Sequence, residues 1–183
     1  MRILTISGSL RRGSHNSRLL RAASDLVPAG VELELYEGLG EIPAYDDDRL
    51  AEPPAPVRRL RSAVERADAV LIATPEYNHS IPGHLKNALD WISRPLAESP
   101  MTGRPAAVVG ASTGMFGAVW AQAETRKVLG ALGARVLDEE LPIPNADEQF
   151  DGDSLRDPEL EGGLRHRLEQ LAGMVAERDT AAA

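Results

Sequence analysis

The sequence predicts an α/β domain built on a parallel β-sheet with helices on both faces. Three apolar runs, at residues 3–6, 69–73 and 106–110, lack the alternation expected of a half-exposed strand. Such runs are typical of strands that are covered on both sides. Segments with helical apolar spacing separate the runs, so strand and helix alternate five times along the chain. The length of 183 residues suits one domain.

Two strands and two helices are expected in the first third of the chain. The run 3–6 leads into a helix whose apolar face carries Leu19, Leu20, Ala23, Leu26 and Val27. Residues 31–36 alternate apolar and acidic side chains, which indicates a strand towards the edge of the sheet. Residues 37–56 are rich in Gly, Pro and Asp and predict a loop, whereas residues 57–67 predict an amphipathic helix.

The rest of the chain continues the same alternation. After strand 69–73 we expect a helix through residue 92, a loop at 95–104, strand 106–110 and a helix ending near Leu132. A short fifth strand follows at Val136 and Leu137, with residues 141–143 as a candidate continuation of this edge, and the last helix covers 160–175. No repeat or second domain is evident. We therefore expect one domain over residues 1–179 and a disordered tail at residues 180–183.

Charge and cysteine content exclude several classes of function. The net charge of −8 argues against general nucleic-acid binding, yet residues 1–24 hold five arginines and no acidic residue. With no cysteine, disulfides, thiol catalysis and thiolate metal sites are excluded, so redox chemistry needs a bound cofactor. Asp46, Asp47 and Asp48 indicate a solvated loop rather than a metal site. No apolar run reaches the length of a membrane span and no signal-peptide pattern opens the chain, so we expect a cytoplasmic protein without membrane contact.

The turn between the first strand and the first helix predicts a phosphate site. Residues 8–17, with the sequence Gly-Ser-Leu-Arg-Arg-Gly-Ser-His-Asn-Ser, combine glycines, hydroxyls and arginines. Free N–H groups at a helix start attract an anion, and an arginine adds a charged fork. The side-chain donors expected here are those of Ser9, Arg11, Ser14, Asn16 and Ser17. The alternative is that Ser14 or Asn16 only caps the helix and that the arginines are solvated. The pattern matches neither the dinucleotide fingerprint nor the Walker A loop.

Two further loops follow the strands 69–73 and 106–110. In the loop 75–80, Tyr77 can lie against a flat ligand, or it is a partly buried side chain of structural use only. In residues 110–117, three glycines let the backbone approach a ring, or they serve ordinary turns. All three loops leave carboxyl ends of parallel strands, where ligands bind to such sheets. A phosphate at one loop and a flat ring at the others favour a flavin mononucleotide.

The chain resembles the NAD(P)H-dependent FMN reductase family over roughly residues 1–150. The resemblance lies in Gly8-Ser9-Leu10-Arg11 with Ser14 and Asn16, in Pro75-Glu76-Tyr77-Asn78 with residues 81–91 (Ile-Pro-Gly-His-Leu-Lys-Asn-Ala-Leu-Asp-Trp), and in Gly110-Ala111-Ser112-Thr113-Gly114. It implies a flavodoxin-like three-layer sandwich with a five-stranded parallel sheet of order 2-1-3-4-5. The third loop departs from the family pattern at Met115 and Phe116, which are larger than the residues of many relatives.

The resemblance also implies the cofactor and its contacts. FMN is expected to bind its phosphate to Ser9, Arg11, Ser14, Asn16 and Ser17, to place its ring against Pro75, Glu76, Tyr77 and Asn78, and to meet Ser112 and Gly114 on the other side. NADPH or NADH is the expected reductant. The acceptor is a small molecule such as a quinone, a free flavin, an azo compound or chromate. A homodimer or homotetramer is implied, with Trp91 and Trp120 as contact residues or, equally, as core residues.

The mechanism expected is hydride transfer to flavin N5 and then reduction of the acceptor in the same place, with no catalytic side chain and no metal. His15, His79 and His84 are interpreted as surface or capping residues, and Glu76 as a loop-structuring carboxylate or a base. The alternatives are an FMN electron carrier of flavodoxin type and an FMN-binding redox sensor. The arginines of the first loop argue against the carrier, whose loop is usually rich in Ser and Thr and free of arginine.

Overall fold

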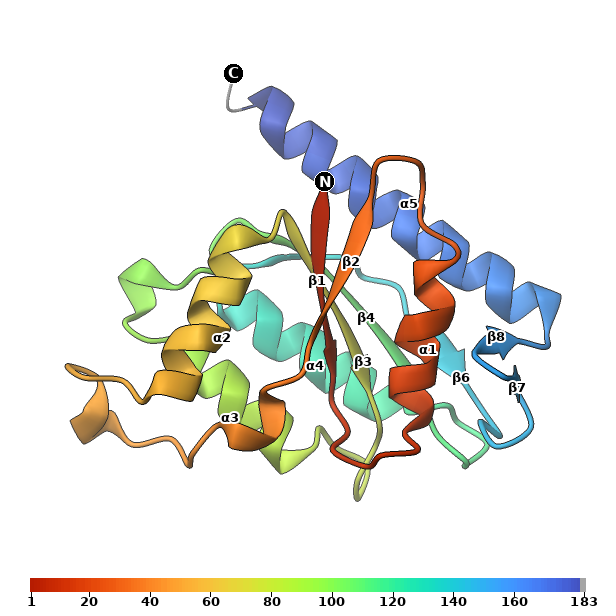
Figure 1. Ribbon diagram of the computed structural model, residues 1–183, viewed down its shortest axis with the longest axis horizontal. Coiled ribbons are helices and arrows are strands. Elements are labelled where there is room, and N and C mark those ends of the chain that lie inside the picture. The colour runs from red at the N-terminus through yellow and green to blue at the C-terminus, as the bar shows by residue number, and fades with distance from the viewer. Residues whose placement is uncertain (182–183) are drawn as a thin grey trace.

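The centre of the protein is a parallel β-sheet with the strand order β2-β1-β3-β4-β5 (Figure 1). The computed structural model describes residues 1–181. Its strands and helices are, in order, β1 (Arg2–Ser7), α1 (His15–Ser24), β2 (Glu32–Tyr36), α2 (Ala55–Arg66), β3 (Ala69–Thr74), α3 (Gly83–Ile92), β4 (Pro105–Ala111), α4 (Val119–Ala131), β5 (Arg135–Val136), β6 (Pro142–Ile143), β7 (Phe150–Asp151), β8 (Ser154–Leu155) and α5 (Pro158–Ala181). The flavodoxin-like order expected from the resemblance is confirmed, with β2 at an edge.

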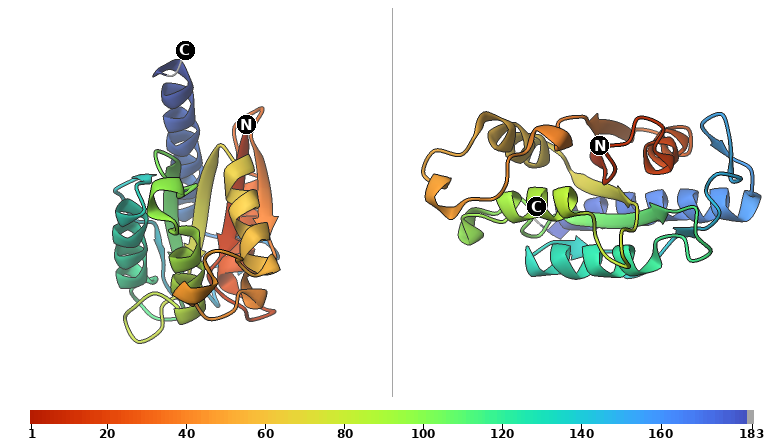
Figure 2. Two further views of the ribbon diagram at one scale, coloured as in Figure 1. Left: turned by 90° about the vertical axis from the view of Figure 1, so that its left-hand side faces the viewer. Right: turned by 90° about the horizontal axis from the view of Figure 1, so that it is seen from below.

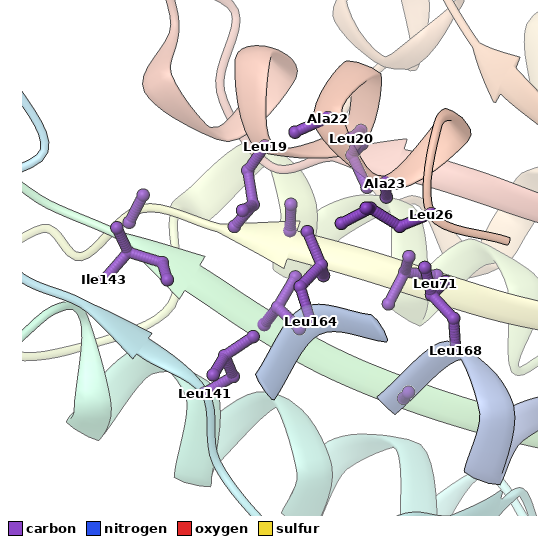
Figure 3. Close-up of a cluster of buried hydrophobic side chains, with 14 of the residues drawn as sticks. Leu19, Leu20, Ala22, Ala23, Leu26, Leu71, Leu141, Ile143, Leu164 and Leu168 are labelled. Atoms are coloured by element: carbon purple, nitrogen blue, oxygen red, sulfur yellow. The ribbon is translucent and has the colours of Figure 1, made fainter. Parts of the chain in front are cut away.

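Two apolar layers, one on each face of the sheet, hold the helices. Helices α1 and α5 pack on one face, where Leu19, Leu71, Leu164 and Leu168 meet in a buried cluster (Figure 3). Helices α2, α3 and α4 pack on the other face through Leu60, Leu89 and Leu129, among others. The predicted central strands β3 and β4 are buried along their whole length, because both of their faces are covered. Figure 2 shows the resulting three layers from two further sides.

The fifth strand is divided into two short pieces. β5 pairs with the start of β4 through Pro105 and Ala106, and β6 pairs with its end through Gly110 and Ala111. The short fifth strand and its edge continuation are therefore both present. Residues 138–140 run between the two pieces, whereas Leu137 and Leu141 still bond to β4 through the Ala106 carbonyl and the Gly110 N–H.

Several features near the chain's loops and its end differ from expectation. The β7–β8 hairpin is unpredicted, although its two-residue turn, Gly152-Asp153, begins with a glycine, whose φ is +58°. Short 3₁₀ turns interrupt the loops expected at 37–56 and 95–104. Helix α5 continues to Ala181, two residues into the segment 180–183 that was expected to be a tail; residues 182–183 lie outside the described part of the chain. Within residues 1–181, no helix combines the length and apolarity needed to cross a bilayer.

Candidate functional site

Three loops meet at the carboxyl ends of β1, β3 and β4, at the lower edge of the sheet in Figure 1. We call them loop 1 (residues 8–14), loop 2 (residues 75–82) and loop 3 (residues 112–118). Together with the start of α1 they surround an open pocket of about 330 Å³. The predicted residues that line it are Ser9, Arg11, Ser14, Asn16, Pro75, Glu76, Tyr77 and Ser112. His15, Ala111 and Thr113 also line it, and none of them was predicted as a site residue.

The start of α1 forms the anion-binding end of this pocket. Ser14 is the N-cap, and its Oγ accepts a hydrogen bond from the Ser17 N–H at 3.3 Å. The next two N–H groups, those of His15 and Asn16, make no hydrogen bond within residues 1–181. The exposed Arg11 guanidinium likewise makes none with the described residues. The capping interpretation of Ser14 is thus confirmed, while free donors remain beside it for an anion.

The Asn16 side chain links the start of α1 to the end of β4. The side chain is buried; its Nδ2 donates to the Ala111 carbonyl at 2.9 Å, and its Oδ1 accepts from the Ala111 N–H at 3.0 Å. Both polar ends of the amide are therefore engaged. The Asn16 backbone N–H is free in the described residues, and a contact of Asn16 with a phosphate stays a prediction.

Three predicted residues do not line the pocket. The Ser17 hydroxyl donates to Ser7 Oγ at 2.9 Å. Asn78 is exposed at the tip of loop 2 with a φ of +53°. The Gly114 N–H donates to Ser112 Oγ at 3.2 Å, and its carbonyl accepts from the Asn145 N–H. Their contact with a cofactor stays a prediction.

Two glycines beside the pocket, Gly8 and Gly117, are required by packing within the protein. A Cβ at Gly8 would lie 2.9 Å from Leu85 Cδ2, and Gly117, at a φ of +56°, would meet the backbone of Ile143 at 2.6 Å. At Gly117 this supports the alternative of an ordinary turn, while the approach of a ligand to the third loop stays a prediction. Their neighbours lie far along the chain, so the sequence alone does not show them.

Loop 2 presents an aromatic ring at the rim of the pocket. Tyr77 and Ser80 exchange two backbone hydrogen bonds of 3.1 Å, and Asn78 and His79 between them both have positive φ. This is the geometry of a tight hairpin turn, for which Asn is a favoured residue. The Tyr77 side chain is 49% exposed and stands free for a flat ligand.

Two carboxylates join loop 2 to helix α4. Glu76 Oε2 accepts hydrogen bonds from the Trp120 and Ala121 N–H groups at 3.1 and 3.2 Å, which are free donors of the first turn. In the opposite direction, Glu124 of α4 accepts from the Ser80 hydroxyl and the Ile81 N–H. These bonds hold the pKa of Glu124 below its usual range and keep it ionised. Glu76 is therefore the loop-structuring carboxylate of the two interpretations considered.

Replacement of Glu76 with Gln is expected to destabilise the protein by about 0.5–1 kcal/mol, because the neutral amide loses the attraction of a charge to the start of α4. Glu76→Ala, which removes both bonds, is expected to lose more. Urea unfolding measures both differences. Glu52→Gln, at an exposed loop carboxylate, is the control. Equal stabilities for wild type and Glu76→Ala would show that loop 2 does not depend on this link.

His15 lies in the pocket wall and is more enclosed than the surface or capping residue that was expected. Its ring stacks on Phe150 of the β7–β8 hairpin at 6.1 Å between centroids, and its Nδ1 is buried without a partner in the described residues. Burial and the nearby Arg11 and Arg18 lower the pKa of His15, although Asp147 opposes this. His84 also has a structural contact, with Nε2 2.9 Å from the Gly8 carbonyl oxygen.

The lowered pKa of His15 predicts how the cofactor-free protein responds to pH. The unfolded state binds the proton more readily than the folded state, so the contribution of His15 is present above its unfolded pKa of about 6.5 and is lost as the pH falls below it. We expect the urea midpoint of wild type to fall more between pH 7.5 and 5.5 than that of His15→Gln. Parallel falls in the two proteins would contradict the assignment.

The two tryptophans have different environments. Trp91 is 1% exposed and its Nε1 donates to the Pro43 carbonyl at 2.9 Å, so it is a core residue and not a surface contact. Trp120 is 40% exposed and lies edge-on to Phe116 and His79. Within residues 1–181, no cluster of three or more His, Asp or Glu side chains is arranged to hold a metal ion.

Known proteins are similar to this chain in both sequence and fold. The model of the family described as NADPH-dependent FMN reductase matches residues 1–148. The chain belongs to this family. It is 45% identical to an NAD(P)H-dependent FMN reductase of Pseudomonas aeruginosa over 93% of each chain, and 34% identical to a quinone reductase of Escherichia coli (strain K12) over 98% of this chain and 87% of that one. A solved flavoenzyme NAD(P)H:(acceptor) oxidoreductase of Paracoccus denitrificans has a TM-score of 0.85 and 33% identity, covering 96% of this chain and 97% of its own.

The protein is thus an oxidoreductase of the FMN reductase family, with FMN as cofactor and NAD(P)H as reductant. The pocket suits this cofactor in its chemistry. One end offers the N–H groups of His15 and Asn16 and the Arg11 guanidinium, which are suited to a phosphate. The other end offers the Tyr77 ring and the polar backbone of loops 2 and 3, which are suited to a flat heteroaromatic ring.

Proposed function

We propose that the protein passes hydride from NAD(P)H through FMN N5 to a small acceptor in a ping-pong sequence, and that a quinone is the acceptor it reduces best. One observation carries this proposal. The same open pocket has free anion donors at one end, at the start of α1, and the free Tyr77 ring of loop 2 at the other. The similar Escherichia coli protein is a quinone reductase, which supports the choice of acceptor.

The proposed roles of the residues are binding and orientation. Arg11, Ser9 and the N–H groups of His15 and Asn16 would hold the phosphate, and Ser14 keeps the helix start in place. Pro75, Glu76, Tyr77 and Asn78 would meet the ring, with Ser112 and Gly114 opposite. When bound, FMN supplies the hydride-accepting and electron-donating chemistry. The protein contributes no nucleophile.

Loops 2 and 3 can also stabilise negative charge that develops on the ring. Glu76 and Thr113 line the pocket, and their N–H groups make no hydrogen bond within residues 1–181. Fixed N–H donors of this kind favour an anion without reorganisation. Because Glu76 is held by α4, its backbone is presented in one position. An open pocket further lets reductant and acceptor use the same place in turn, as a ping-pong sequence requires.

A spectroscopic experiment tests the proposal. The purified protein is incubated with FMN, gel-filtered, and followed at visible wavelengths while NADPH or NADH and then a quinone are added anaerobically. We expect a retained flavin spectrum that bleaches with the nucleotide and returns with the quinone. A retained spectrum that does not bleach would favour a flavodoxin-type carrier or a redox sensor. Parallel lines in double-reciprocal plots of steady-state rates would support the ping-pong order, and intersecting lines would contradict it.

A homodimer, or a homotetramer built from it, is the assembly that we propose. Exposed Met115, Phe116 and Trp120 form an apolar group beside loop 2, at 72%, 54% and 40% exposure. Apolar side chains gathered in this way often mark an interface. We further propose that the protein acts in the cytoplasm, where its reductant is available.

Replacement of Trp120 with Asp tests the proposed contact. We expect the variant to shift to a smaller species in light scattering coupled to gel filtration, because a charge at the centre of an apolar contact is costly to bury. Leu96→Asp, at an apolar side chain that is 60% exposed on another surface, is the control. A wild type that is monomeric at all concentrations would contradict the proposal.

A further inference from the structure

His15 lies beside the proposed phosphate position. It lines the pocket next to Ser9, Arg11 and Ser14, and it is the first residue of α1, whose free N–H groups form the anion-binding end. The ring is fixed from behind: Phe150 stacks on it, and the Arg18 guanidinium lies 4.8 Å from the centroid of the same Phe150 ring. Arg18 also donates to the Gly152 carbonyl, so the β7–β8 hairpin is fastened to α1. A ring held in this way is oriented before a ligand arrives.

Only one ring nitrogen of His15 can meet a ligand. Nδ1 is buried and has no hydrogen-bond partner in the described residues, whereas Nε2 is not among the buried unpaired atoms and makes no hydrogen bond there. A buried N–H without an acceptor is costlier than a buried acceptor without a donor. The neutral ring therefore keeps its proton on Nε2. That places an N–H donor on the accessible side of the ring.

We propose that His15 is a further ligand of the cofactor phosphate, to which it donates a hydrogen bond through Nε2–H. This inference rests on the proposed phosphate position. It gives the site a neutral side-chain donor in addition to the Arg11 charge and the N–H groups of α1. It also assigns a purpose to the β7–β8 hairpin, which holds the ring in place although it is remote in sequence.

The test compares two flavins that differ only in the phosphate. Dissociation constants for FMN and riboflavin are measured by flavin fluorescence for wild type, His15→Phe and His15→Gln. Phe retains the stacking on Phe150 and removes the donor, whereas Gln retains a donor. We expect His15→Phe to weaken FMN binding roughly tenfold, the effect of losing one hydrogen bond to a charged group, and to leave riboflavin binding unchanged. His15→Gln should recover part of the loss. His166→Phe, at an exposed histidine of α5, is the matched control.

The outcomes separate this inference from the proposed function. Equal weakening of FMN and riboflavin by His15→Phe, or no change for FMN, would overturn the role of His15 as a phosphate ligand. If wild type bound no FMN, the proposed function would fail. A second measurement, which needs no flavin, would then still test whether His15 binds phosphate. In that measurement, the ¹⁵N resonances of the histidines are followed during titration with inorganic phosphate. A saturable shift of His15 Nε2, absent for His166, is expected; a ring that does not respond overturns the inference.

Discussion

Asn16→Ala is expected to lower the free energy of unfolding by about 2–5 kcal/mol, because it leaves two buried backbone groups without partners. The N–H and the carbonyl of Ala111 both bond to the Asn16 amide, and Ala111 is buried at the end of β4. Urea unfolding of the cofactor-free protein measures the loss.

Asn16→Asp is the matched comparison for this prediction. The carboxylate can still accept from the Ala111 N–H, but it has no donor for the Ala111 carbonyl and repels it. The loss of unfolding free energy in Asn16→Asp is expected to grow with pH, because the carboxyl ionises. The loss in Asn16→Ala should not change in this way, since alanine has no group that ionises. Both variants should also bind FMN less well, since the link sets the position of the α1 start. A loss below about 1 kcal/mol for Asn16→Ala would mean that the two backbone groups find other partners.

Arg11→Ala is expected to weaken FMN retention by about 1.5–3 kcal/mol, or roughly 10–150-fold, the range for hydrogen bonds to a charged group. Arg11 lines the pocket and its guanidinium has no other partner in the described residues, so the variant should fold as well as wild type. Equilibrium dialysis measures the dissociation constant. A higher salt concentration should weaken wild type more than the variant, because the interaction that is lost is between charges.

The neighbouring Arg12 supplies the control for Arg11. It is equally exposed but does not line the pocket, so Arg12→Ala should retain FMN as wild type does. Riboflavin, which lacks the phosphate, should bind equally to wild type and Arg11→Ala. Unchanged FMN affinity in Arg11→Ala would place the phosphate elsewhere in the pocket.

The fold and the position of the site could be predicted because they follow from local patterns. A short continuous apolar run such as 69–73 is typical of a strand covered on both faces, and parallel strands bring their carboxyl-end loops to one edge. Ser14 could be recognised as a possible cap from its place before a helical pattern. Each of these inferences needs only residues that are close in the chain.

The parts that were missed depend on contacts between distant residues. Asn16 and Ala111 are 95 residues apart, and nothing in either segment shows that the amide is taken up by the backbone of β4. The same holds for His15, whose ring packs against Phe150. It also holds for Gly8, where a side chain would collide with Leu85. Residue types near the site were therefore predictable, but the division between those that support the pocket and those that face it was not.

The division of the fifth strand affects whether a strand of another molecule can add to the edge of this sheet. An open sheet edge offers unpaired N–H and carbonyl groups to any other strand, which is a route to aggregation. Here the middle of the β4 edge is bordered by the excursion between β5 and β6, which carries Asp138, Glu139 and Glu140. Glu140 pairs with Arg126 at 2.5 Å and Glu139 with Arg167 at 2.5 Å, so both carboxylates have partners on neighbouring helices. A foreign strand that approaches this border would meet three acidic side chains and an interrupted ladder of backbone hydrogen bonds. The sheet therefore ends there.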